Sequence, residues 1–304
     1  MLPFRARRLL YHARSAGSES NLWNHAVATG VYVTRVLMLV VLVFGVLGVG
    51  ARGQTTGASE LDRLLDLYVR DGFVYYAALK TERATLGRVV RAISDVPSDF
   101  SAWSTDSAKA FWLNAYNALV LQTVVDQYPI RGSAPEYPRN SIRQIAGAFD
   151  QRSHSVAGQE LTLDAIESEV LRTFDDPRLF LALGRGAVGS GRLRSEVYTA
   201  SRVEEQLEAV VKEYATLPQY VALDRLAEEV RVSAVFGWRS SEFVAAFGDR
   251  GWTDSGRAPI ERAILTMIEP ALFPSERAYL EANEFSLRYQ DFDWRLNDLT
   301  GGRP

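Results

Sequence analysis

The sequence predicts an α+β fold that is predominantly α-helical, with a few short strands around a central buried helix. The segment 107–127 is apolar almost all round, which is typical of a helix at the centre of a domain. Most other windows place apolar residues at helical spacing, whereas alternation typical of strands is confined to short runs. The sequence contains no internal repeat and no low-complexity block.

Each element follows from a local pattern. Apolar residues at helical spacing predict helices at residues 58–70, 81–93, 107–127, 141–146, 204–214, 259–270 and 275–283. Thr162 is a good N-cap, with Asp164 in the first turn, for a helix that ends near Phe174. Ser240 is expected to cap a short helix. Short apolar or alternating runs predict strands at residues 72–76, 179–183, 230–236 and 285–289.

The N-terminal region predicts export. Val36 to Gly50 is a run of about fifteen uncharged residues, which is the length of a signal-peptide core and short for a span of ~20 residues. Arg35 precedes the run, and the small residues before Arg52 permit cleavage after Ala51. The alternatives are an uncleaved anchor that extends back toward Ala26, or a buried core helix. Either export route predicts an extracytoplasmic protein, secreted or anchored.

Three parts of the chain follow from this interpretation. Residues 1–51 form the signal peptide or membrane anchor, residues 52–57 a polar linker, and residues 58–304 a single globular domain. The basic residues before Arg35 obey the positive-inside bias, but this leader is long for a signal peptide. Whether residues 1–30 are translated therefore stays open. Contact with a membrane is expected only through the N-terminal segment.

Composition excludes several chemistries. The 304 residues are 47% hydrophobic and carry a net charge of -3, so no positive field attracts nucleic acid. There is no cysteine, which excludes disulfides, thiolate nucleophiles and cysteine-ligated metals. The three histidines are His12, His25 and His154, and only the last lies in the predicted domain, too few for a histidine-based metal site. No metal and no cofactor are expected.

Four motifs give the chain a resemblance to a known family. They are the Phe-Trp-x-Asn-x-Tyr-Asn-Ala-Leu pattern at residues 111–119, Tyr-Pro-Ile at 128–130 followed by Ser-Ile-Arg at 141–143, Leu-Asp-x-Ile-Glu at 163–167, and Asp-Trp-x-Leu-Asn-Asp at 293–298. Together they resemble the family known as domain of unknown function 547, over residues 60–298. The resemblance implies no established reaction. The family's cysteine-bearing loop corresponds to residues 184–194, where its two cysteine positions hold Arg185 and Ser190. This chain therefore resembles a cysteine-less variant.

The loop 184–194 is the main candidate site. Its Gly-x-Gly-x-x-Gly run matches a dinucleotide-binding fingerprint, but Glu204 opens a helix instead of ending a strand, so nucleotide binding is not favoured. The loop also contains five candidate residues for an anion site, in which backbone N–H groups and guanidinium groups hold a carboxylate or phosphate. They are Arg185, Gly186, Gly189, Arg192 and Arg194. The alternative is that the glycines permit a tight path and the arginines pair with acids such as Glu196.

Two asparagines are expected to lie beside this loop. Asn114 and Asn117 are three residues apart on the apolar helix, so both amides are expected to be buried and to need partners. They either hold loop backbone to the central helix or line a ligand pocket next to the glycine loop.

A hydrolytic pair is the remaining catalytic hypothesis. His154 lies in a polar stretch and is the only side chain of the domain with an ordinary pKa near neutrality, so Ser190 and His154 form a conceivable nucleophile and base. Ser190 lacks the flanking pattern of a nucleophile elbow, and the alternative is a surface histidine.

The tryptophans suggest carbohydrate stacking, but most are better explained as core. They are Trp103, Trp112, Trp238, Trp252 and Trp294. The favoured function is an extracytoplasmic domain that binds a small anionic ligand or a peptide terminus at Gly184 to Arg194. The alternatives are a hydrolase that uses Ser190 and His154, or a non-catalytic envelope scaffold. The oligomeric state stays open.

Overall fold

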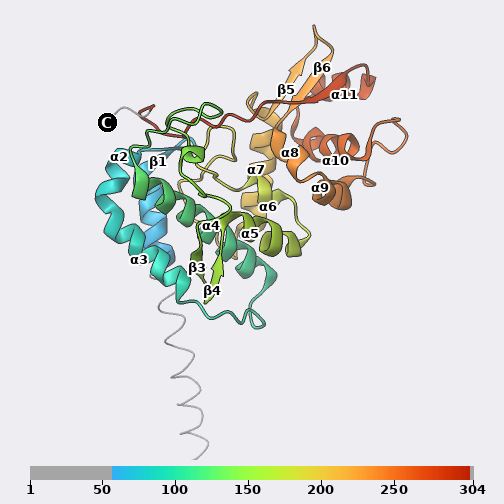
Figure 1. Ribbon diagram of the computed structural model, residues 1–304. Coiled ribbons are helices and arrows are strands. Elements are labelled where there is room, and N and C mark those ends of the chain that lie inside the picture. Colours follow the sequence, from blue (N-terminus) through green and yellow to red (C-terminus); the bar gives the residue numbers. More distant parts are fainter. Residues whose placement is uncertain (1–56, 302–304) are drawn as a thin grey trace, which may run out of the picture. The chain divides into compact units, whose positions relative to one another are not determined.

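The computed structural model describes residues 57–301 (Figure 1). The export or anchor segment expected near Val36 to Gly50 and the cleavage after Ala51 lie outside the described residues. Over residues 57–301, no helix is both long enough and apolar enough to span a bilayer.

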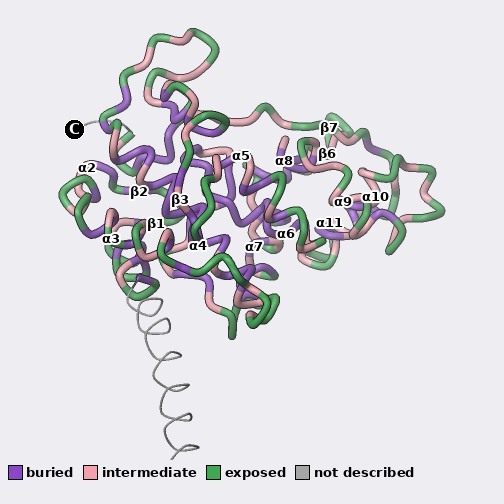
Figure 2. Tube along the Cα trace, turned by 60° about the horizontal axis from the view of Figure 1, so that its bottom comes forward, coloured by how far each residue is buried: buried purple, intermediate pink, exposed green. Residues whose placement is uncertain are grey.

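A central buried helix organises the fold, as the sequence predicted. This helix is α4 (Thr105–Gln127), and the Oγ of Ser104 caps it by accepting the N–H of Ser107. Fifteen of its residues are buried, including Leu113, Tyr116 and Leu119. Figure 2 shows the buried trace concentrated around α4. The mainly helical α+β class predicted from the sequence is confirmed.

Shorter helices precede and follow α4 along the chain. Residues 57–68 form the first of them. The others are α2 (Tyr76–Leu79), α3 (Arg83–Ser94), α5 (Leu163–Ala165), α6 (Arg178–Leu181), α7 (Val203–Thr216), α8 (Ala234–Trp238), α9 (Ser240–Phe247), α10 (Pro259–Ile268) and α11 (Pro274–Ala282). The helix that Thr162 begins continues from α5 through a π-helical stretch, Ile166–Val170, and a 3-10 turn, Leu171–Phe174.

The strands are short and form three small sheets. The first two are the hairpins β1 (Val69–Arg70) with β2 (Phe73–Val74), and β3 (His154–Val156) with β4 (Gln159–Leu161). The third has the order β5 (Val221–Asp224), β6 (Glu229–Val232), β7 (Ser286–Tyr289). β5 and β6 are antiparallel, whereas β6 and β7 are parallel, with Val230 opposite Leu287.

Four local predictions were wrong. The helix expected at 141–146 is a 3-10 turn, Ile142–Gln144, that begins where the Oγ of Ser141 accepts the N–H of Arg143 at 3.1 Å. The strand expected at 179–183 is the helix α6, whose N-cap is Pro177. In the turn before it, the side chain of Asp176 accepts the N–H of Arg178 at 3.2 Å, which favours a turn over an extended strand. The strand expected at 230–236 ends at Val232, because Ser233 caps α8. Ser240 is the first residue of α9 and does not cap it.

The C-terminal segment closes the domain on its N-terminal part. The Val74 N–H donates to the carbonyl of Asn297 at 2.8 Å, and the Leu299 N–H donates back to Val74 at 2.9 Å. The Asn297 amide also bonds the carbonyl of Gly72 and the hydroxyl of Tyr76, each at 2.9 Å. Residues near the two ends of the described chain are thus held together by hydrogen bonds.

Candidate functional site

The two asparagines of α4 hold loop backbone. The amide of Asn114 makes two bonds to Tyr198, with Nδ2 donating to the carbonyl at 2.8 Å and Oδ1 accepting the N–H at 2.9 Å. Oδ1 of Asn117 accepts the N–H of Gly184 at 2.8 Å. Both side chains therefore satisfy backbone groups that would otherwise be buried without partners.

The loop 184–194 lies largely inside the protein, and its arginines pair with acids. Arg192 contacts Asp71 at 2.7 Å, and Arg194 contacts Glu213 at 3.3 Å. Arg185 is 3% exposed and contacts Glu167 at 2.7 Å. Arg185 also lines a cavity.

The glycines of this loop serve close packing. Gly186 has a φ of 66°, a left-handed conformation that favours glycine. A Cβ on Gly189 would lie 2.7 Å from the backbone nitrogen of Asp293, so only glycine allows the C-terminal segment to approach. The N–H groups of Val188 and Gly189 donate to the carbonyls of Arg295 and Asp293 at 2.9 Å. These two N–H groups are thus taken up by the protein itself.

Ser190 and His154 make no contact with each other among the described residues. Ser190 is 2% exposed, and its Oγ donates to the carbonyl of Ala187 at 2.6 Å. His154 lies on β3 and is buried, not in the polar surface loop that the sequence suggested. Its Nε2 has no hydrogen-bond partner within residues 57–301. Burial and the charge of Arg152 lower the pKa of His154. The geometry brings no base to Ser190.

Arg185 leads instead to a cavity of about 530 Å³, here called the arginine–aromatic cavity. Its walls combine arginines, carboxylates and aromatic rings. The lining residues are Arg143, Phe149, Asp164, Glu167, Ser168, Arg185, Trp238, Arg239 and Trp294.

A buried ionic network forms one wall of the cavity. Arg185 donates from Nε and Nη2 to the two carboxylate oxygens of Glu167, at 3.0 and 2.7 Å. Glu167 also accepts the hydroxyl of Tyr116 at 2.6 Å and a guanidinium N–H of Arg239 at 2.9 Å. Burial alone would raise the pKa of Glu167, but the two guanidinium groups and the Tyr116 hydroxyl hold it below its ordinary value. Glu167 is therefore a fixed anion between two fixed cations.

Aromatic rings form a second wall. The indoles of Trp238 and Trp294 are stacked, with centroids 6.0 Å apart and planes 19° apart. The ring centroid of Phe292 is 4.7 Å from that of Trp238 and 4.4 Å from that of Trp294. Trp238 is 47% exposed, so the expectation that it belongs to the core was wrong. It follows a strand, but the intervening helix α8 carries its side chain toward solvent.

Arg143 lies over this aromatic wall. Its guanidinium carbon is 4.5 Å from the ring centre of Trp294 and 5.0 Å from that of Phe149, at cation–π distance. Its side chain makes no hydrogen bond and no ion pair with any residue of the described chain. The guanidinium N–H groups of Arg143 are therefore free to bind a ligand.

A second carboxylate, that of the exposed Asp164, also lines the cavity. Desolvation and the neighbouring charge of Glu167 raise its pKa. Arg143 and Arg239 act in the opposite direction, but neither forms an ion pair with Asp164 within residues 57–301. Ser168, four residues further along the same helical segment, adds an exposed residue to the lining.

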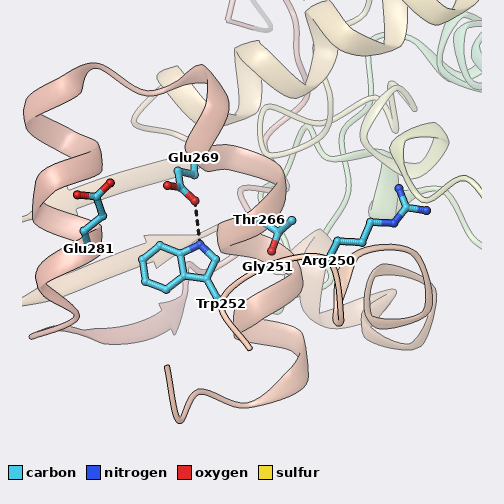
Figure 3. A pocket seen from close by; sticks show the side chains of 6 residues that line it. All are labelled: Arg250, Gly251, Trp252, Thr266, Glu269 and Glu281. Atoms are coloured by element: carbon cyan, nitrogen blue, oxygen red, sulfur yellow. Dashed lines mark hydrogen bonds between the residues drawn. The ribbon is translucent and has the colours of Figure 1, made fainter. Parts of the chain in front are cut away.

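A different cavity, of about 420 Å³, surrounds Trp252 (Figure 3). The indole Nε1 donates to Glu269 at 2.9 Å, and Glu281 also lines the space. Figure 3 shows the guanidinium of Arg250 directed away from the indole. With two carboxylates near the ring, this cavity does not suit an anion. In the part of the chain that the structure describes, no three histidines or acids are grouped to hold a metal ion.

Sequence reasoning missed Arg143, Glu167 and Arg239 as site residues. It considered Trp238 and Trp294 for carbohydrate stacking but favoured a place in the core. A usable signal was present, since three of the motifs that carry the family resemblance converge on this cavity. The segment 141–143 supplies Arg143, the segment 163–167 supplies Asp164 and Glu167, and the segment 293–298 supplies Trp294.

Comparison with known proteins gives one match. No curated protein and no solved structure matches the chain. Residues 100–215 match the sequence model of the family described as "Protein of unknown function, DUF547". This stretch includes α4 and six of the nine residues that line the arginine–aromatic cavity, namely Arg143, Phe149, Asp164, Glu167, Ser168 and Arg185. The chain therefore carries a domain of the uncharacterised DUF547 family.

Proposed function

We propose that this protein is an extracytoplasmic binding protein that holds a small anionic ligand in the arginine–aromatic cavity. The observation that carries the proposal is the free guanidinium of Arg143, which is positioned on an aromatic wall and makes no hydrogen bond with the described residues. A planar guanidinium binds a carboxylate or phosphate through two parallel hydrogen bonds.

The charge of the lining favours an anion. Three arginines face two carboxylates, which leaves the cavity with a net positive charge. The single carboxylate of Glu167 binds the guanidinium groups of both Arg185 and Arg239, so this wall of the cavity has a net positive charge. Partial exclusion of water strengthens the attraction between such charges and a bound anion.

This proposal moves the centre of the site from the place that the sequence suggested. Of the loop Gly184 to Arg194, Arg185 alone reaches the cavity, and it acts by fixing Glu167 and Arg239. Asn117 supports the loop from behind by holding Gly184. The other candidates make structural contacts elsewhere: Asn114 binds the backbone of Tyr198, Arg192 pairs with Asp71, and Arg194 pairs with Glu213.

Protection against thermal unfolding tests the binding function. A panel of small carboxylates and phosphates, at constant ionic strength, should include at least one that raises the midpoint temperature of the wild-type domain. Arg143→Gln should lose this protection. Arg91→Gln, at an exposed arginine of α3 outside the cavity, is the matched control and should keep it. If no anion of the panel protects the wild type, the proposed function is wrong.

Export rests on the sequence alone. The uncharged run Val36 to Gly50, the arginine before it and the polar stretch after Ala51 support secretion or anchoring. Mass spectrometry of the N-terminus of the native protein tests cleavage after Ala51. Fusion of a reporter that is active only outside the cytoplasm, placed after Pro304, tests export itself. A reporter that stays inactive in a stable fusion would contradict it.

A further inference from the structure

We infer that the ligand of the arginine–aromatic cavity is an acidic sugar, meaning a pyranose that carries a carboxylate. This inference rests on the proposed anion-binding function and adds the class of ligand. Three features of the cavity support it, and each corresponds to one chemical part of such a molecule.

The first feature is the exposed indole plane. Trp238 is 47% exposed, although it stacks on Trp294 and touches Phe292. An exposed indole next to charged groups leaves apolar surface in water, and covering that surface is favourable. A simple carboxylate or phosphate has no apolar face to cover it. The C–H face of a pyranose ring does.

The second feature is the carboxylate in an anion site. Asp164 repels a simple anion, so its place in the lining requires a ligand with hydrogen-bond donors. Ring hydroxyls donate to a carboxylate. The hydroxyl of Ser168 donates its own hydrogen to the carbonyl of Asp164 at 2.7 Å, so it can accept from a ring hydroxyl. Because Asp164 forms no ion pair with any described residue, its oxygens are open to such donors.

The third feature is the arrangement of the donors. Arg143 rests on Trp294, so its planar group lies beside the same wall that would cover the sugar ring. A carboxylate attached to the ring would then reach Arg143 while the ring lies against Trp238. The volume of about 530 Å³ is within the range of small-molecule sites and leaves room for more than one ring.

The test measures binding by calorimetry with glucuronate, galacturonate, sialate, their neutral counterparts and the dipeptide Ala-Ala. At least one acidic sugar should bind the wild type about tenfold more tightly than its neutral counterpart. Trp238→Ala should weaken that binding by about tenfold, because it removes the stacking plane. Tyr75→Ala, which removes an aromatic ring of similar exposure (43%) outside the cavity, should leave it unchanged.

Asp164→Ala separates the two kinds of anion. It should weaken acidic-sugar binding, since an acceptor for the hydroxyls is lost, and it should strengthen binding of acetate, since a repelling charge is lost. If acetate or the C-terminal carboxylate of Ala-Ala binds in an Arg143-dependent manner and no acidic sugar does, the anion site stands and the sugar assignment is wrong. If acidic sugars bind equally well to Trp238→Ala, the assignment of the aromatic wall is wrong. If no probe binds, both proposals fall.

Discussion

Arg185 and Glu167 form a two-point ion pair in the interior, with Nε to Oε1 at 3.0 Å and Nη2 to Oε2 at 2.7 Å, and each residue is about 95% buried or more. The same carboxylate also binds Arg239 and Tyr116, so one side chain orders three others. Because a buried charge without its partner is expensive, this carboxylate has a large role in both stability and site geometry.

Replacement of Glu167 by glutamine should therefore strongly destabilise the domain. The buried guanidinium of Arg185 would lose its counter-charge, at a cost of about 3–5 kcal/mol. Urea unfolding followed by circular dichroism measures the change. Glu169→Gln, at an exposed acid two residues further on, is the matched control and should change the unfolding free energy by less than about 0.5 kcal/mol. Equal stability of the two variants would show that the ion pair contributes nothing net.

Asn117→Ala should also destabilise the domain, by about 1–3 kcal/mol, because the buried N–H of Gly184 would lose its acceptor. Chemical unfolding gives the value. Gln127→Ala, at the exposed last residue of α4, removes an amide that makes no hydrogen bond with the described residues and should have little effect. A loss confined to ligand binding, with stability intact, would instead mean that Asn117 contacts the ligand.

Gly189→Ala should cost about 2 kcal/mol, because the new Cβ would lie 2.7 Å from the backbone nitrogen of Asp293. Thermal unfolding measures it. Gly158→Ala is a useful comparison, since Gly158 has a φ of 69° but no atom within 4 Å of an added Cβ. Gly158→Ala should therefore lower the unfolding free energy only through backbone strain, by about 1 kcal/mol. If the two variants are equally stable, the C-terminal segment moves to make room.

His154 should make stability depend on pH below neutrality. Burial and Arg152 lower its pKa in the folded state, below the ordinary value of 6.5 that the unfolded chain retains. The unfolded state therefore binds more protons between these two values, and stability falls as the pH drops from about 6.5 through the folded pKa. The unfolding free energy of His154→Gln should decline less between pH 7.5 and 5. Identical slopes for variant and wild type would exclude His154 as the cause.

Long patterns in the sequence were enough to predict the main elements. The apolar composition of 107–127 predicted a buried central helix, and α4 is that helix. The type of short elements was harder to predict. An apolar run such as 179–183 contains no polar residue whose spacing would distinguish a helix from a strand. The hairpin of β3 and β4 was missed because its turn is Ala157-Gly158, both at positive φ, where Asn-Gly would have been recognised.

The site was harder to predict than the fold. The sequence pointed to Arg185, but its partner Glu167 and the exposed Trp238 depend on packing between segments far apart in the chain. Arg143 and Trp294 are about 150 residues apart, and no spacing rule connects them. Their motifs were visible separately, and only the folded chain shows that they share one cavity.

The contacts of Asn297 and Leu299 with the strand at Val74 have a consequence for biosynthesis. The residues that complete this closure, together with Trp294 of the cavity wall, are synthesised about 220 residues after Val74. A chain that is still being made therefore lacks both the closing hydrogen bonds and a complete binding site. For a protein proposed to cross a membrane, this order leaves the strand at Val74 without these partners until residue 299 has been synthesised.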